Sequence, residues 1–95
     1  MNKQTGRNEK YPKEIITWKR GDKVPQWLSD VCNIIKVDEK GEPELDIRES
    51  GDGYELITSG TNQVIVKVAH KDDFVCFGDR KIFTLTKKQK ELLYD

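Results

Sequence analysis

Histidine and cysteine are scarce in this sequence, which contains only His70, Cys32 and Cys76 of these two types. None of them shows the paired spacing of zinc ligands, so we expect no metal site and no cofactor. The two cysteines stand in a predicted helix and a predicted strand, and we expect free, buried thiols rather than a disulfide. Apolar runs near 18 residues are also missing, and no secretory h-region follows Met1. We therefore expect a cytoplasmic protein without a membrane span.

Groups arranged for catalysis are equally sparse. A nucleophilic site needs a serine, cysteine or threonine beside a base, and the single imidazole lies in a predicted turn with no nucleophile placed next to it. Asp72 and Asp73 are adjacent, so in a strand without a kink they point to opposite faces and do not serve one acid–base or cation site together. The glycine turns at 51–53 and 78–80 lack the following helix of a phosphate-cradling loop. The sequence therefore predicts a protein that is not an enzyme.

Net charge is absent as well, because 17 Lys and Arg balance 17 Asp and Glu. This neutrality argues against a binder of duplex DNA, which is typically basic. The charge is unevenly spread: residues 1–23 hold seven bases and three acids, whereas residues 38–55 hold eight acids and two bases. The basic segment is suited to attract a phosphate-bearing ligand and the acidic segment to mimic one, but such runs are also common on ordinary solvated faces.

What the sequence does contain is strand patterning, clearest in the stretch Val64–Leu85. Valines alternate with other residues in the run 64–68, which places them on one face of a strand. A polar corner leads to the apolar run Asp73–Phe77, and a turn at 78–80 leads to Lys81–Leu85. This pattern predicts a meander of three short antiparallel strands, on which we expect the remaining elements to pack.

The other predicted elements follow from local signals. Pro25 suits the first turn of a helix, and apolar residues at helical spacing predict about ten residues ending near Asn33 or Ile35, with Trp27 as the main anchor. Thr86 is a predicted N-cap of a C-terminal helix, with Gln89 completing a capping box. Further strands are predicted at Glu14–Lys19, Glu44–Glu49 and Tyr54–Thr58, with a polar loop at 38–43 and turns at 50–53 and 59–62.

Together these elements predict an α+β fold. We expect a small, curved, mostly antiparallel sheet of about six strands, one helix after the first strand and a short C-terminal helix. Residues 1–13 are poor in aliphatic side chains and are predicted to form a flexible N-terminal arm. Residues 14–95 are predicted to form a single domain, which matches the length of the chain.

A candidate ligand site lies at the end of the first predicted strand. Trp18, Lys19, Arg20 and Lys23 place an aromatic ring and three cations there, and this combination holds bases and phosphates in many proteins. Arg80, in a later hairpin turn, is expected to close such a pocket. A tryptophan in a strand is also a common core residue, so the sequence leaves open whether Trp18 is a ligand platform or part of the core.

Most of the chain, from Glu14 to Tyr94, resembles the PGDYG-domain proteins, a family of small phage and prophage proteins. The family combines a first strand ending in Trp and followed by Gly-Asp, a Pro-acidic-Trp-Leu helix start, an alternating strand, a Gly-Asp-Tyr strand, a Gly turn and a closing helix ending in Tyr. The matching segments here are Trp18, Gly21-Asp22, Val24–Leu28, Asp73–Gly78, Ile82-Phe83 and Glu91–Tyr94. The family has no established chemistry, so the resemblance assigns no functional residue.

The resemblance implies a phage-encoded accessory protein in the cytoplasm of a bacterial host. Three functions stay open. The first is counter-defence, in which Trp18, Arg20, Lys23 and Arg80 bind and sequester a nucleotide-derived immune signal. The second is inhibition of a host or defence enzyme through the acidic segment 38–55, acting as a mimic of nucleic acid. The third is a virion or morphogenesis component. A homo-oligomer formed through an open strand edge is compatible with each of them.

Overall fold

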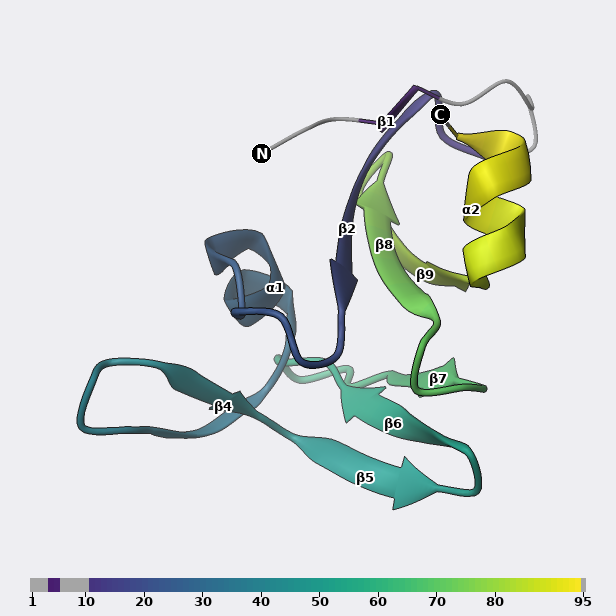
Figure 1. Ribbon diagram of the computed structural model, residues 1–95. Coiled ribbons are helices and arrows are strands. Elements are labelled where there is room, and N and C mark those ends of the chain that lie inside the picture. Colours follow the sequence, from purple (N-terminus) through teal and green to yellow (C-terminus); the bar gives the residue numbers. More distant parts are fainter. Residues whose placement is uncertain (1–3, 6–10, 95) are drawn as a thin grey trace.

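The structure, a computed structural model, describes residues 4–5 and 11–94 (Figure 1). Strands dominate it, and both helices are short. In chain order the elements are β1 (Gln4–Thr5), β2 (Glu14–Lys19), α1 (Gln26–Val31), β3 (Ile34–Val37), β4 (Pro43–Leu45), β5 (Ile47–Ser50), β6 (Gly53–Ile57), β7 (Ile65–Val68), β8 (Phe74–Gly78), β9 (Lys81–Leu85) and α2 (Lys87–Leu93).

The strands form three small sheets, with orders β1-β2-β8-β9, β3-β4 and β5-β6-β7. Every pairing between these strands is antiparallel. The expected α+β class with mostly antiparallel strands is therefore confirmed, but the single curved sheet of about six strands is wrong. In Figure 1 the three-stranded sheet lies below the four-stranded one, and the β3–β4 hairpin projects to one side.

The predicted meander at Val64–Leu85 divides between two sheets. Strand β7 pairs with β6, whereas β8 pairs with β2 and β9. The chain changes sheet at the corner between β7 and β8, where the Asp73 amide donates to the His70 carbonyl oxygen at 2.9 Å. The buried Asp73 carboxylate accepts from the His70 amide at 3.2 Å. These two bonds stabilise a corner in place of the expected turn within one sheet.

The predicted strand at 44–49 is also divided, at Asp46. The Asp46 amide donates to the Asn33 carbonyl oxygen at 3.0 Å, and its own carbonyl oxygen accepts from the Ile57 amide at 3.2 Å. The Asn33 side-chain amide adds a bond to the Asp46 carboxylate at 3.0 Å. Asp46 thus links β4 and β5 to segments from elsewhere in the chain, and the two strands belong to different sheets.

Helix α1 is shorter than predicted, with six residues instead of about ten. It ends because Cys32 has an extended backbone (φ −100°, ψ 152°) and pairs as an isolated bridge with Thr58. The β-branched residues that follow form β3, in line with their preference for strands. Leu28, which is fully buried, is the main core residue of the helix, whereas Trp27 is only half-buried.

Several local predictions are confirmed. Helix α2 has the expected capping box, in which the Thr86 hydroxyl accepts from the Gln89 amide at 3.0 Å and the Gln89 side chain accepts from the Thr86 amide at 2.9 Å. The β5–β6 turn pairs Ser50 with Gly53. The predicted strands at Glu14–Lys19 and Lys81–Leu85 are present with those bounds.

The buried side chains form two clusters. The larger lies between α1, β2 and β4–β8 and contains Trp18, Leu28, Cys32, Leu45, Tyr54, Leu56, Val66, Val68 and Val75. The smaller lies beside α2 and contains Ile15, Cys76, Leu85 and Tyr94. Both cysteines are free and buried, as expected.

Most of the predicted N-terminal arm, residues 1–3 and 6–10, lies outside the described residues. Within the arm, Gln4–Thr5 form β1 and pair with β2. The Tyr94 hydroxyl donates to the Pro12 carbonyl oxygen at 2.6 Å, which joins the segment before β2 to the end of α2. Neither helix of the described ranges has the length and apolar character required to cross a membrane.

Candidate functional site around Arg20

Trp18 belongs to the core. Its side chain is 5% exposed and packs in the larger buried cluster. The indole N–H donates to the Asp22 carbonyl oxygen at 3.1 Å, and the Asp22 amide donates to the Lys19 carbonyl oxygen at 3.0 Å. The ring therefore stabilises the turn that follows β2, and this turn places the next residue, Arg20. Such burial leaves no open aromatic face for stacking a ligand on Trp18.

Arg20 carries the central charge of the site. Its guanidinium binds both carboxylate oxygens of Glu49, with Nη1 and Oε1 2.8 Å apart, and Nη2 bonded to Oε2. The guanidinium carbon lies 4.9 Å from the ring centroid of Tyr54, a cation–π contact. The hydrogen bond with Glu49 raises the pKa of Arg20 and lowers the pKa of Glu49. Glu49 is nonetheless 70% exposed, and exposed ion pairs open readily.

The basic and acidic segments of the sequence meet here. Lys23 lies 3.4 Å from the Glu42 carboxylate, so a second cation of the predicted site also pairs with the acidic segment. Glu44 pairs across the β3–β4 hairpin with Lys36 at 3.3 Å. Three carboxylates of the acidic segment are therefore matched by cations. The sequence gives no local signal for this pairing, because Arg20 and Glu49 are 29 positions apart.

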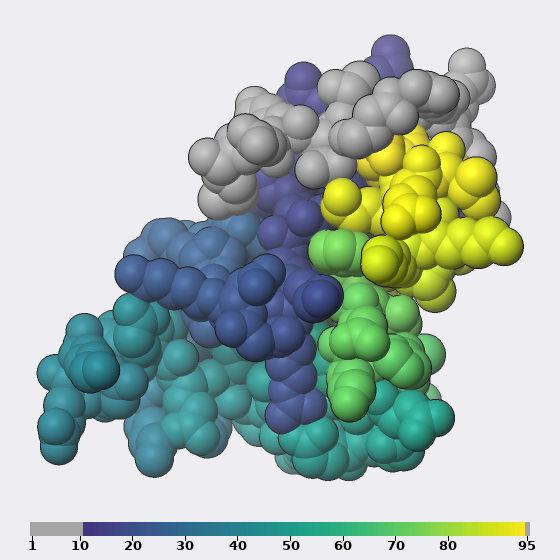
Figure 2. Space-filling view, viewed as in Figure 1, coloured from purple at the N-terminus to yellow at the C-terminus, as the bar shows by residue number. Residues whose placement is uncertain are grey.

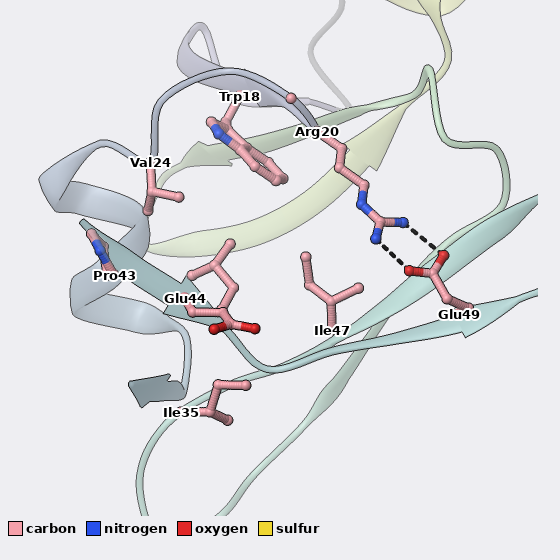
Figure 3. Close-up of a pocket in the computed structure, with 10 residues that line it drawn as sticks. Trp18, Arg20, Val24, Ile35, Pro43, Glu44, Ile47 and Glu49 are labelled. Atoms are coloured by element: carbon pink, nitrogen blue, oxygen red, sulfur yellow. Dashed lines mark hydrogen bonds and ion pairs between the residues drawn. The ribbon is translucent and has the colours of Figure 1, made fainter. Parts of the chain in front are cut away.

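A hollow of about 420 Å³ opens beside this ion pair (Figure 3). In Figure 3, Trp18 lies at the top, Val24 at the left and Ile47 below them, while Arg20 reaches across to Glu49 at the right. The lining is mixed: Val24, Ile35 and Ile47 are apolar, whereas Arg20 and Glu49 are charged. The full lining is Trp18, Arg20, Gly21, Val24, Ile35, Pro43, Glu44, Leu45, Ile47 and Glu49.

A second hollow, of about 380 Å³, shares the Arg20–Glu49 pair. Its other lining residues come from the β5–β6 turn and from the corner after β7, and they are Gly51, Asp52, Gly53, His70 and Lys71. The Lys71 amide donates to the Asp52 carbonyl oxygen at 3.0 Å, which ties the corner to the turn. The ion pair thus lines both hollows, the first with a mixed lining and the second with a mainly polar one.

The remaining predicted site residues lie elsewhere. Lys19 pairs in the sheet with Phe74, at one end of β8, and lines neither hollow. Arg80 lies two residues after Gly78, at the other end of β8. At the usual rise of a strand, Gly78 is about 13 Å from Phe74. The backbone of Arg80 is in the left-handed region (φ 62°) and its side chain is exposed. Arg80 therefore does not close the site around Arg20, contrary to the expectation from sequence.

The buried thiols have little reactivity at neutral pH. Burial raises the pKa of Cys32 to about 11 and that of Cys76 to about 12, so both remain protonated. Within residues 11–94, no cluster of three or more His, Cys, Asp or Glu side chains is placed to hold a metal ion. The arrangement around Arg20 is suited to binding a charged group next to an apolar one.

No family model, curated protein or solved structure matches this chain. The resemblance to the PGDYG-domain proteins therefore stays a prediction, as does the phage origin that it implies. Function has to be inferred from the two hollows and the charged residues between them.

Proposed function

We propose that this protein is a non-catalytic binding protein that holds an anionic, nucleotide-like small molecule around Arg20. The observation that carries the proposal is that Arg20 lines the same hollow as the apolar side chains of Val24 and Ile47. An apolar or heteroaromatic group of the ligand fills the hollow between Val24 and Ile47, and a negative group of the ligand binds the guanidinium. The volume, about 420 Å³, falls in the range of small-molecule sites.

Binding without chemistry agrees with the residues at hand. The lining of both hollows contains no cysteine, serine or threonine to act as a nucleophile. Arg20 stays charged at every accessible pH, because the bond to Glu49 raises a pKa that is already high. Such a group holds an anion but transfers no proton. The proposed activity is therefore capture and retention of the ligand.

The biological setting that we propose is the one implied by the resemblance to phage proteins. A small phage-encoded binding protein in the bacterial cytoplasm would act by lowering the free concentration of a nucleotide-derived immune signal. In this role the protein needs affinity and abundance but no turnover. The part of Trp18, in this proposal, is to hold the turn that presents Arg20.

A thermal-shift screen of the purified protein tests the proposal. The panel contains nucleoside monophosphates, cyclic dinucleotides, ADP-ribose and its cyclised forms. A ligand at 100 times its Kd stabilises a protein by about 2.7 kcal/mol, which is several degrees for a domain of this size. We expect at least one compound to give such a shift.

The matched variants are Arg20→Ala and Arg48→Ala. Arg48 is exposed on β5, next to Glu49 in sequence, and lines neither hollow. We expect Arg20→Ala to lose the shift and Arg48→Ala to keep it. Absence of a shift across the panel, or an equal shift in both variants, would reject the proposal. Trp18→Ala is a poor test, because loss of a buried indole destabilises the fold whatever the ligand does.

A second candidate function, docking on a protein, is favoured by the β3–β4 hairpin. Its residues Ile35 and Val37 are 56% and 61% exposed, so this one hairpin presents two aliphatic side chains to solvent. Figure 2 shows this part of the chain projecting from the body as a blue-green arm. In this proposal the hairpin, with the adjacent acidic segment, contacts a host or defence enzyme. The virion component and the homo-oligomer stay predictions.

The internal contacts of the acidic segment make charge reversal an unsuitable test of docking. Charge reversal at Glu42, Glu44 or Asp46 would break contacts within the protein as well as any contact with a partner. Val37→Asp changes the exposed face of the hairpin, and Val64→Asp, at a residue of 58% exposure outside it, is the control. Loss of a co-purified host protein in the first variant only would support docking through the hairpin. If both variants retained the host protein equally, docking through the hairpin would be rejected.

A further inference from the structure

We infer that the second hollow, between the β5–β6 turn and the corner after β7, is a phosphate subsite that Glu49 closes in the free protein. The inference rests on the proposed function, because it states where the charged part of the ligand binds. The apolar part of the ligand occupies the first hollow, and Arg20 contacts both parts because it lines both hollows. The ligand class is then a phosphate ester with an apolar or heteroaromatic group.

Three side chains with nitrogen donors belong to the lining of the second hollow. Arg20 and Lys71 each bring a positive charge, and His70 brings an imidazole. The His70 Nδ1 atom accepts from the Asp72 amide at 3.1 Å. In the neutral ring Nε2 therefore carries the proton and serves as a donor. No carboxylate of residues 11–94 forms a salt bridge with Lys71, so its ammonium is available to a ligand.

The corner that carries these donors is fixed before any ligand binds. The Asp73 carboxylate, only 8% exposed, accepts from the His70 amide at 3.2 Å. The Lys71 amide donates to the Asp52 carbonyl oxygen at 3.0 Å. The backbone of the corner is thus held both from the core and from the β5–β6 turn. A site held in this way loses less conformational entropy when it binds a ligand.

Glu49 occupies the place of the ligand's anion. Its carboxylate makes the same two-point contact with the guanidinium that a phosphate would make. A monocarboxylate replacing Glu49 would exchange one carboxylate for another, with no net gain. A phosphate that reaches Arg20, Lys71 and His70 together gains contacts that Glu49 lacks. Once Glu49 is displaced, Arg20 and Lys71 face Asp52 in the lining, and the Asp72 carboxylate lies 3.7 Å from Nδ1 of His70, on the side of the ring away from Nε2. We expect the two cations and Nε2 to favour a phosphate over a monocarboxylate ligand.

The test uses inorganic pyrophosphate as the probe and acetate as the monocarboxylate comparison, with Kd measured by calorimetry on the full chain. We expect Glu49→Gln to lower the Kd for pyrophosphate about two- to fivefold, because the competing anion is removed. We expect Lys71→Ala to raise this Kd roughly three- to tenfold. Glu39→Gln and Lys40→Ala, in the exposed β3–β4 turn, are the matched controls and should leave it unchanged.

The outcomes separate this inference from the proposed function. If nucleotides bind the wild type but the Kd for pyrophosphate is unchanged in both Glu49→Gln and Lys71→Ala, the subsite is wrong and the proposed function stands. If pyrophosphate binds with the expected changes but no nucleotide does, the subsite stands and the proposed nucleotide-like ligand is wrong. Equal gains for acetate and pyrophosphate in Glu49→Gln would overturn the stated selectivity. If neither compound class binds any variant, both proposals fail.

Discussion

The two ends of the molecule are held together in different ways. Near α2, the small cluster contains Ile15 of β2, Cys76 of β8, Leu85 of β9 and Tyr94, which follows α2. Around Arg20, the larger cluster and the ion pairs join segments that are far apart in sequence. Long-range contacts occur at both ends, since the Tyr94 hydroxyl bonds to Pro12 near α2. The α2 end is held mainly by apolar packing, whereas the Arg20 end adds an ion pair beside two hollows.

Leucine truncation gives the largest expected contrast between the ends. Leu56 is 0% exposed in the larger cluster and Leu85 is 1% exposed in the smaller one. We expect Leu56→Ala to lower the free energy of unfolding by about 4 kcal/mol and Leu85→Ala by about 2–3 kcal/mol, because a smaller cluster near the surface collapses more easily around the cavity. Urea unfolding measures both. Equal losses would mean that the two clusters respond as a single core.

Glycine substitution at each end should give the next largest difference. A Cβ at Gly53 would lie 1.9 Å from the Val68 carbonyl oxygen, so β6 and β7 would have to separate. A Cβ at Gly78 would meet the Glu14 carbonyl oxygen at 2.7 Å, a milder clash. We expect losses of about 3 kcal/mol for Gly53→Ala and about 1–2 kcal/mol for Gly78→Ala in thermal unfolding. A Cβ at Gly51 would meet no atom within 4 Å, but the φ of +56° there is unfavourable for other residues. Gly51→Ala therefore measures backbone strain alone, and we expect it to lower the free energy of unfolding by about 1 kcal/mol.

The raised pKa values of the two buried thiols, one at each end, predict how the free energy of unfolding changes at alkaline pH. Burial raises the pKa of Cys32 from 9.0 to about 11 and that of Cys76 from 9.0 to about 12. The folded state keeps its protons where the unfolded state has lost them, so this stabilisation is complete below pH 9. As the pH rises above 9 toward the folded-state pKa of each thiol, this stabilisation is lost at a rate on the order of 1 kcal/mol per pH unit for each thiol.

Urea midpoints at pH 8, 9.5 and 10.5 measure this slope. Cys32→Ala and Cys76→Ala should each make the slope between pH 9.5 and 10.5 shallower, because one of the two raised thiol pKa values is removed. Besides burial, Cys32 also raises the pKa of Tyr54, and Cys76 also raises the pKa of Tyr94. The difference in slope therefore reports each thiol together with its effect on the neighbouring tyrosine. An unchanged slope in both variants would contradict the prediction.

Two tyrosines give the smallest contrast. The Tyr94 hydroxyl donates to Pro12, so Tyr94→Phe should cost about 1 kcal/mol. The Tyr54 hydroxyl is buried and has no hydrogen-bond partner among residues 11–94. Tyr54→Phe should therefore be neutral or stabilise by up to about 1 kcal/mol, since an unsatisfied polar group is removed. Destabilisation by Tyr54→Phe in urea unfolding would show that this hydroxyl has a partner.

Predictions from the sequence succeeded where the signal lay within a few residues. The capping box of Thr86 and Gln89 and the turn from Ser50 to Gly53 are local hydrogen-bonding or backbone preferences. The strand at Glu14–Lys19 is rich in β-branched residues, and its bounds are as predicted. Each of these features depends on the residues in it more than on what packs against it.

Predictions failed where a distant segment decided the outcome. The strand at 44–49 breaks because Asp46 bonds to Asn33 and Ile57. The helix after Pro25 stops because Cys32 pairs with Thr58. Neither partner is visible in a local pattern, so an unbroken strand and a longer helix were predicted.

The candidate site was partly predicted. Trp18 and Arg20 line the first hollow, but Lys19, Lys23 and Arg80 do not. Glu49, His70 and Lys71 were missed as site residues because their relation to Arg20 arises from the packing of the β5–β6 turn against the corner after β7. The opposite charges of residues 1–23 and 38–55 were the one available signal. They were interpreted as two separate surfaces, although opposite charges in one small protein attract each other.

The bond from Tyr94 to Pro12 makes the described body of the protein nearly a closed ring. The two residues are 82 positions apart in sequence, yet 2.6 Å separates their bonded oxygen atoms. Figure 1 shows that this junction and the β3–β4 hairpin lie at opposite extremes of the molecule. A circular permutant that links Tyr94 to Tyr11 and opens the chain between Glu39 and Lys40 would therefore keep every strand pairing except that of β1 with β2, because β1 is removed. The order of the chain is separable from the architecture that surrounds Arg20.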